Sequence, residues 1–120
     1  MRVAIILAVL IPTAPALAAS WTDHTSCAIL NAVMDATAPP MVDVRASLLY
    51  ISNTFETMDS RHTEAGEPGI MAGLSDNGLR DLAAAAAVHC GNFPRLTVYN
   101  AAAFVYRGTR DLMIDLGTAK

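Results

Sequence analysis

The sequence predicts an all-α fold, a small bundle of four to five helices held together by one disulfide bond. Apolar residues recur at spacings of three and four, a run of alanines fills positions 83–87, and only two cysteines occur. Alternation of apolar and polar residues never persists for five positions, although residues 96–99 could extend briefly. We therefore expect helices joined by turns rather than a sheet.

Residues 1–18 have the pattern of a cleaved secretion signal. Arg2 gives the short positive start, positions 3–11 are all apolar, and residues 16–18 (Ala-Leu-Ala) place small alanines at the two positions where a signal peptidase needs them. A membrane span needs about 20 apolar residues, and Pro12 interrupts this run. We expect cleavage and export to the periplasm, with secretion from the cell as the alternative.

Cleavage after Ala18 or Ala19 would leave one domain at residues 19–120, with its core at about 21–116. The chain has eight basic and eleven acidic side chains, so the loss of Arg2 leaves seven basic ones and a net charge of −4. The basic residues do not cluster, which argues against nucleic acid and anionic membranes as partners. No later run is long enough for an integral membrane segment.

The two cysteines, Cys27 and Cys90, predict one disulfide in an exported chain. They lie 63 positions apart, and closing a loop of that length would stabilise the fold by about 4 kcal/mol. Two alternatives stay open, namely two unpaired buried thiols, or a metal site that also uses His24 and His89. Neighbouring helical residues point about 100° apart, so His89 and Cys90 are poorly placed to share one ion. We expect no metal and no cofactor.

Caps and prolines set the expected helix ends. The first helix begins at Thr25 or Ser26 and ends before Pro39-Pro40, because a residue before proline is pushed out of the helical region. One face of this helix carries Cys27, Leu30 and Val33 or Met34.

The C-terminal half of the chain contains two more expected helices. One is capped by Ser75 or Asp76 and runs to Cys90, with Gly91 after it at the position of a left-handed C-terminal cap. The other starts within residues 94–97, with Gly108 as a point of interruption.

The clearest helix in the sequence is the second, in which apolar residues alternate at spacings of four and three. This narrow seam consists of Met41, Val44, Leu48, Ile51, Phe55 and Met58. The polar residues that fall mostly away from it are Asp43, Ser47, Asn53, Thr54, Glu56 and Thr57. The seam is either part of the core or a partner-binding stripe. It could serve as both if the core opens and exposes it. The candidate client or dimer surface comprises Val44, Leu48, Ile51 and Phe55.

Residues 59–74 are expected to form the main loop, because they contain three glycines, Pro68 and several charges. A short turn is expected near Ile70. The charged residues at the start of this segment, with His62 among them, are interpreted as a solvated helix end.

Nothing in the sequence indicates catalysis. The histidines at 24, 62 and 89 are far apart, and no phosphate-binding loop, metal-ligand spacing or nucleophile elbow occurs. With both cysteines bridged, no free thiol would remain as a nucleophile. We interpret the protein as a non-enzyme.

Two segments around the cysteines carry a resemblance to a known family. Residues 25–30 are Thr-Ser-Cys-Ala-Ile-Leu, and residues 90–94 are Cys-Gly-Asn-Phe-Pro, followed by Leu96 and Ala101-Ala102. They are similar to the T-x-C-x-x-F/L opening, and to the second cysteine, proline turn and alanine-containing last helix, of the HdeA-like periplasmic proteins. The order of expected elements is also similar over about residues 21–107.

The resemblance implies a small all-α fold and, as in the family's founding members, an acid-stress chaperone. Such a protein is a folded homodimer near neutral pH. In strong acid it loses its dimer contacts, partly unfolds and covers unfolded clients with apolar surface, while the disulfide holds the opened chain together. At pH 2 the mature chain would carry +11, from seven basic side chains, three histidines and the amino terminus. Repulsion of that size can loosen a small domain.

Immunity and inhibitor proteins are a second class of small exported helical proteins with a disulfide. They block the active site of a toxin or an enzyme with an exposed face or loop, and residues 59–74 could be that loop. The partners to be distinguished are therefore unfolded client proteins and a single protein target.

Overall fold

The computed structural model describes residues 21–119, and this part of the chain contains four α-helices and one 3-10 helix. The elements follow the order α3 (Cys27–Asp35), α4 (Met41–Glu64), η1 (Met71–Gly73), α5 (Asp76–Asn92) and α6 (Val98–Asp115). The all-α fold with one disulfide is thereby confirmed. The predicted secretion signal lies outside the described residues.

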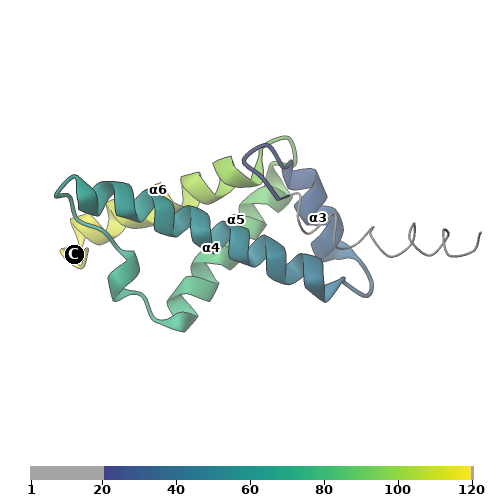
Figure 1. The fold of residues 1–120 in the computed structure, drawn as a ribbon, viewed down its shortest axis with the longest axis horizontal. Coiled ribbons are helices and arrows are strands. Elements are labelled where there is room, and N and C mark those ends of the chain that lie inside the picture. The colour runs from purple at the N-terminus through teal and green to yellow at the C-terminus, as the bar shows by residue number, and fades with distance from the viewer. Residues whose placement is uncertain (1–20, 120) are drawn as a thin grey trace, which may run out of the picture.

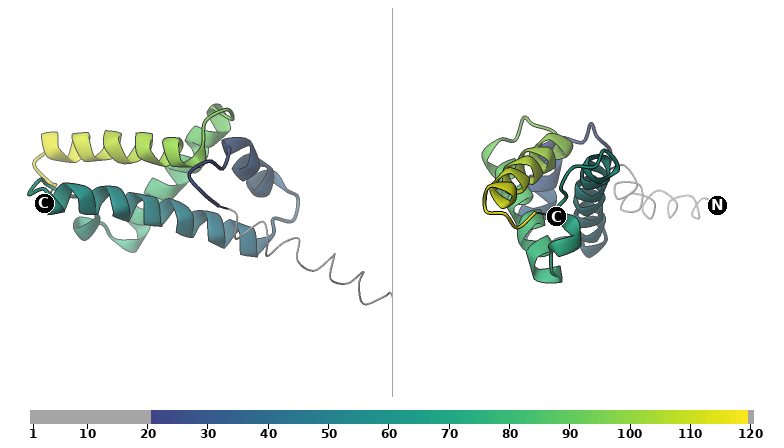
Figure 2. Two further views of the ribbon diagram at one scale, coloured as in Figure 1. Left: turned by 45° about the horizontal axis from the view of Figure 1, so that its top comes forward. Right: turned by 90° about the vertical axis from the view of Figure 1, so that its left-hand side faces the viewer.

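The two longest helices, α4 and α6, run side by side along the length of the molecule (Figures 1 and 2). Helix α5 crosses them obliquely and packs on α6, and its C-terminal end meets α3 at one end of the molecule. The core lies where α4, α5 and α6 meet, and its largest fully buried side chains include Phe55, Ile51 and Tyr106. Among the described residues, no helix is long and apolar enough to span a membrane.

Hydroxyl side chains begin three of these helices, as the cap rules predict. Ser26 accepts a hydrogen bond from the N–H of Ala28, Ser75 from Gly78, and Thr97 from Asn100. The first loop, which contains Pro39 and Pro40, separates α3 from α4.

Two expected glycine breaks are absent from the structure. Gly91 lies inside α5, which ends at Asn92, and Gly91 is not among the residues with positive φ. Gly108 lies inside α6 without interrupting it. A helix tolerates an interior glycine at a cost of about 1 kcal/mol, so neither glycine alone ends its helix.

The disulfide joins Cys27 at the start of α3 to Cys90 near the end of α5, and both residues are fully buried. Two backbone hydrogen bonds of 2.8 Å link this end of α3 to the start of α6 and the residues before it, because Cys27 donates to Leu96 and Val98 donates to Thr25. They form an isolated antiparallel bridge between Ser26 and Thr97, so the short extension expected at 96–99 amounts to one bridge.

The seam predicted on α4 is confirmed in its C-terminal half and wrong in its N-terminal half. Ile51 and Phe55 are completely buried, but 37% of the Leu48 side chain is exposed. The buried face instead continues through Ser47 and Asp43. Ser47 can occupy this face because its hydroxyl bonds within the helix, whereas Oδ1 of Asp43 is buried without a hydrogen-bond partner in the described part of the chain. The Ser47 hydroxyl donates to the carbonyl oxygen of Val44, at 2.7 Å.

Candidate functional site

The side chain of Asp59 ties three parts of the fold together. It lies near the end of α4, with 7% of its surface exposed. Its Oδ1 accepts hydrogen bonds from the backbone N–H of Ile70 at 2.7 Å and from the hydroxyl of Tyr106 at 2.6 Å. Its Oδ2 accepts one from the N–H of Met71 at 3.2 Å. These four residues, called the Asp59 cluster below, join α4 to η1 and to α6.

A glycine allows the loop backbone to come this close to α4. A Cβ atom at Gly69 would lie 2.7 Å from Oδ2 of Asp59 and 2.7 Å from Cγ2 of Thr63, which is too close for either contact. Pro68, the residue before Gly69, is bound to α6, because Nε of Arg110 donates a hydrogen bond to its carbonyl oxygen at 2.9 Å. The loop is therefore fixed against both long helices.

His62 lies beside this cluster on the same face of α4. Its Nδ1 is 2.7 Å from Oε1 of Glu67, and its ring stacks on Tyr106 with centroids 6.1 Å apart. The hydrogen bond with His62 lowers the pKa of the exposed Glu67 carboxyl. The interpretation of this stretch as a solvated helix end holds for most of it, because α4 ends at Glu64 and Ser60, Arg61, Thr63 and Glu64 are exposed. Asp59 is the exception because it is buried, and the His62 side chain is about one-third exposed.

Hydrogen bonding and burial act in opposite directions on Asp59. Burial would raise the pKa of its carboxyl, but the bonds from Tyr106 and from two backbone N–H groups, with His62 nearby, hold the pKa below its ordinary value. Burial and the bond to Asp59 raise the pKa of the Tyr106 hydroxyl, so it remains a neutral donor.

The lowered pKa of Asp59 fixes the sign of its effect on stability. A carboxyl whose folded pKa lies below its unfolded value, about 3.9 for aspartate, stabilises the fold at neutral pH, and that stabilisation is lost as the pH falls through the folded pKa. The charged group that acts on Asp59 is His62 from α4, and Arg110 from α6 acts on its partner Tyr106 and on Glu67 in the loop. In acid, both carboxylates become neutral and the cations remain.

The variant Asp59→Asn tests this dependence, because it keeps the shape of the side chain and removes its charge. We expect the free energy of unfolding at pH 7 to fall by about 1.5–3 kcal/mol, the range for hydrogen bonds to a charged group. The difference between pH 7 and pH 3.5, measured by urea unfolding, should also shrink. Asp81→Asn, in which an exposed carboxylate of α5 is removed, is the matched control. An unchanged pH dependence in Asp59→Asn would contradict the assignment.

The structure divides the predicted client or dimer surface. Ile51 and Phe55 lie in the core, Val44 is half-buried, and Leu48 is exposed. Leu48 lines an apolar groove of about 300 Å³ between α4 and α5, opposite Leu79. Only the N-terminal half of the predicted surface is therefore accessible in the folded monomer.

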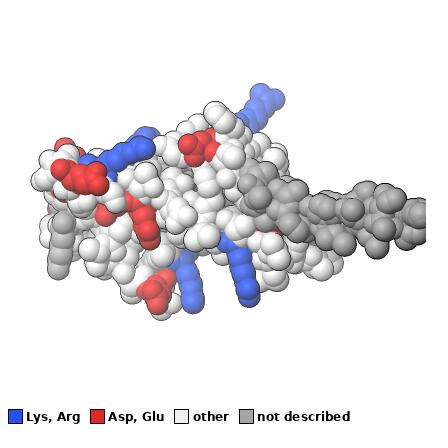
Figure 3. Space-filling view, viewed as in Figure 1, with Lys and Arg blue, Asp and Glu red and all other residues white. Residues whose placement is uncertain are grey.

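Other apolar side chains extend the accessible surface. Leu49 of α4 and Phe104 of α6 are each more than 60% exposed, and Phe93 is 52% exposed. The rings of Phe93 and Phe104 both pack on His89, whose centroid lies 4.8 and 4.3 Å from theirs. Figure 3 shows acidic and basic side chains scattered over one face, with wide uncharged areas between them.

Sequence reasoning did not identify the Asp59 cluster. A usable signal was present, because Asp59 follows Phe55 by four residues and so shares its buried face. A carboxylate at such a position, followed by a glycine-containing loop, suggests that backbone N–H groups of the loop reach it. The predicted loop at 59–74 is shorter than expected, because it begins only after Glu64, and Gly69 and Ile70 are buried.

Three of the four side chains considered for a metal site make other contacts. Cys27 and Cys90 are bonded to each other, and His89 stacks with phenylalanine rings. Over residues 21–119, no group of three or more histidine, cysteine, aspartate or glutamate side chains is arranged to hold a metal ion. Comparison of the chain with models of known protein families, with curated protein sequences and with solved structures gives no match.

Proposed function

We propose that this protein is an exported, periplasmic chaperone that binds unfolded client proteins in acid. The observation that carries the proposal is the Asp59 cluster, in which one buried carboxylate accepts three hydrogen bonds from separate parts of the fold. An ionised carboxylate at the centre of the tertiary contacts makes the folded state sensitive to acid. The similarity of the cysteine segments to the HdeA-like proteins supports the same function.

Protonation would weaken the contacts between the loop and the two long helices. Neutral Asp59 is a poorer acceptor for the N–H groups of Ile70 and Met71, and neutral Glu67 loses its charge-assisted bond to His62. Ile70 is 1% exposed in the folded state and belongs to the core cluster that contains Phe55. Release of the loop would therefore expose apolar surface that the folded state covers.

This newly exposed surface would add to apolar surface that is already accessible. The groove beside Leu48 and the neighbouring Leu49 lie on α4, the same helix that carries Phe55 and Asp59. If the C-terminal half of α4 lost the contacts that cover it, Phe55 would become exposed and would form one longer apolar stripe with the groove and Leu49. A stripe of this kind suits unfolded chains, which present apolar segments without a fixed shape.

The decisive measurement is light scattering from an unrelated protein that aggregates in acid, at pH 2.5 and at pH 7. We expect the protein to suppress scattering at pH 2.5 at equal or few-fold molar excess, and to have no effect on heat-aggregated client at pH 7. Circular dichroism should show that much helix remains at pH 2.5 while a dye that binds apolar surface becomes fluorescent.

The control for this assay is the Asp59→Asn variant at intermediate pH. Since its cluster lacks the charge already at neutral pH, its protection should begin at a higher pH than that of the wild type. Failure of the wild type to suppress scattering at several-fold molar excess would rule out the chaperone. That result would favour a role in blocking a single protein target, as immunity and inhibitor proteins do.

A further inference from the structure

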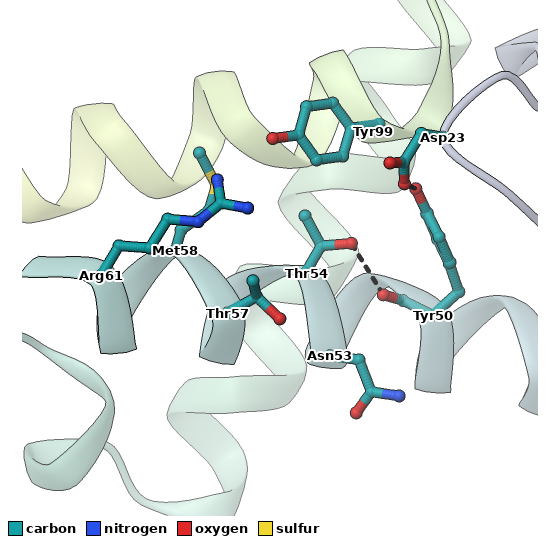
Figure 4. A pocket seen from close by; sticks show the side chains of 8 residues that line it. All are labelled: Asp23, Tyr50, Asn53, Thr54, Thr57, Met58, Arg61 and Tyr99. Atoms are coloured by element: carbon teal, nitrogen blue, oxygen red, sulfur yellow. Dashed lines mark hydrogen bonds between the residues drawn. The ribbon is translucent and has the colours of Figure 1, made fainter.

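A second site is indicated by a cavity of about 260 Å³ between α4 and α6. The segment before α3 closes one end of it, and side chains from successive turns of α4 form one wall (Figure 4). The Asp59 cluster does not line this cavity. The inference is therefore independent of the proposed chaperone function.

The two ends of the cavity carry opposite charges. At one end Asp23 accepts a hydrogen bond of 2.7 Å from the hydroxyl of Tyr50. At the other end is Arg61, whose side chain runs back along α4 toward the cavity, as helical side chains tend to do (Figure 4). Tyr50 and Arg61 start from points about 16 Å apart along the helix axis. Because the Arg61 side chain extends along α4 toward Tyr50, its guanidinium lies closer to the Tyr50 hydroxyl than the two backbone positions lie to each other (Figure 4).

The polar groups between these ends are available to a ligand. Four side chains that line the cavity make no hydrogen bond or ion pair with any residue in the described range, namely those of Asn53, Thr57, Tyr99 and Arg61. The neighbouring Thr54 is different, because its hydroxyl donates to the carbonyl oxygen of Tyr50 at 2.9 Å. Figure 4 shows the Tyr99 hydroxyl and the Arg61 guanidinium in the space between α4 and α6, whereas the Asn53 side chain points away from α6.

We propose that this cavity binds a short peptide with both termini free, of about the size of a dipeptide. The guanidinium of Arg61 would hold the carboxylate through paired hydrogen bonds, and Asp23 would hold the ammonium group, flanked by the rings of Tyr50 and Tyr99. A volume of 260 Å³ equals about nine waters at roughly 30 Å³ each. A dipeptide of small residues spans about 7 Å and has a similar number of non-hydrogen atoms.

The charge pattern selects against other small molecules. A simple carboxylate would satisfy Arg61 and leave Asp23 without a cation, and an amine would do the reverse. A ligand with two negative groups would place one of them near Asp23. A zwitterion matches both ends, and the amide in its middle matches the hydroxyl of Thr57.

The test is a titration of the ¹⁵N-labelled protein with alanyl-alanine at pH 7, followed by amide chemical shifts. We expect saturable shifts confined to the segment around Asp23, to residues 50–61 and to the region of Tyr99. N-acetylated alanyl-alanine and alanyl-alanine amide should each bind about tenfold more weakly or worse, and acetate should not compete at equal concentration.

Two variants of exposed residues locate the site. Arg61→Gln and Asp23→Asn should each weaken binding of alanyl-alanine at least about tenfold, with unchanged melting temperatures. Arg80→Gln, at an exposed arginine beside the apolar groove, is the matched control and should bind as the wild type does. The proposal is wrong if a peptide blocked at both ends binds equally well, if Arg61→Gln binds normally, or if alanyl-alanine causes no saturable shifts at millimolar concentrations.

Discussion

The variant Phe55→Ala is expected to lower the free energy of unfolding by about 3–5 kcal/mol. Phe55 is completely buried, and its ring stacks on that of Tyr106 with centroids 6.5 Å apart. Removing the ring leaves a cavity where α4 meets α6, and close-packed neighbours fill such a space only in part. Urea unfolding at pH 7, monitored by circular dichroism, measures the loss.

Leu48→Ala is the matched control, because the two residues lie on the same helix and belong to the same predicted seam. With 37% of Leu48 exposed, we expect a cost of about 1 kcal/mol or less. Equal costs for the two variants would contradict the buried face described here. A cost for Leu48→Ala that grows with protein concentration would instead show that a second copy of the chain covers this residue.

The double variant Cys27→Ala/Cys90→Ala should have the other large effect. The bridge closes a loop with a sequence separation of 63, and on the chain-entropy model its loss lowers stability by about 4 kcal/mol. Both sulfurs are buried, so the substitution also removes packing. Wild-type protein that is reduced but not alkylated is the comparison, because it has lost the bond and keeps both cysteine side chains. The difference between the variant and the reduced wild type therefore measures the packing contribution alone.

The same bond should be required for protection of clients in acid. Reduced protein at pH 2.5 is expected to leave client scattering unsuppressed, because the opened chain would expand and no longer hold its apolar segments together. Protein that is oxidised and carried through the same buffer exchange is the control. Equal protection from the reduced and oxidised forms would mean that the bridge has no part in client binding.

The helix starts could be predicted because their causes are local. A hydroxyl at Ser26, Ser75 or Thr97 bonds a backbone N–H only two or three residues away, so the sequence pattern contains both partners. The glycine breaks were predicted wrongly for a related reason. A glycine costs a helix only about 1 kcal/mol, so α5 and α6, which pack on each other, continue through Gly91 and Gly108.

The candidate site depended on longer-range contacts. The partners of Asp59 are 11, 12 and 47 residues away, so a reading of the sequence around residue 59 shows a charged stretch and nothing more. The buried face of α4 was misplaced at Ser47 because hydropathy counts a hydroxyl as polar. In the helix that hydroxyl is satisfied by its own backbone, and the residue can be buried.

The disulfide closes a covalent ring and leaves one segment before it and one after it outside the ring. The ring runs from Cys27 to Cys90 and contains α3, α4, η1 and nearly all of α5, whereas α6 lies entirely outside it. Nothing covalent limits how far α6 can move away except the short connection after α5. If non-covalent contacts fail, α6 is therefore the helix that can separate. The ring would keep α4 and α5 within reach of each other and present the surfaces that Tyr106 and its neighbours on α6 had covered.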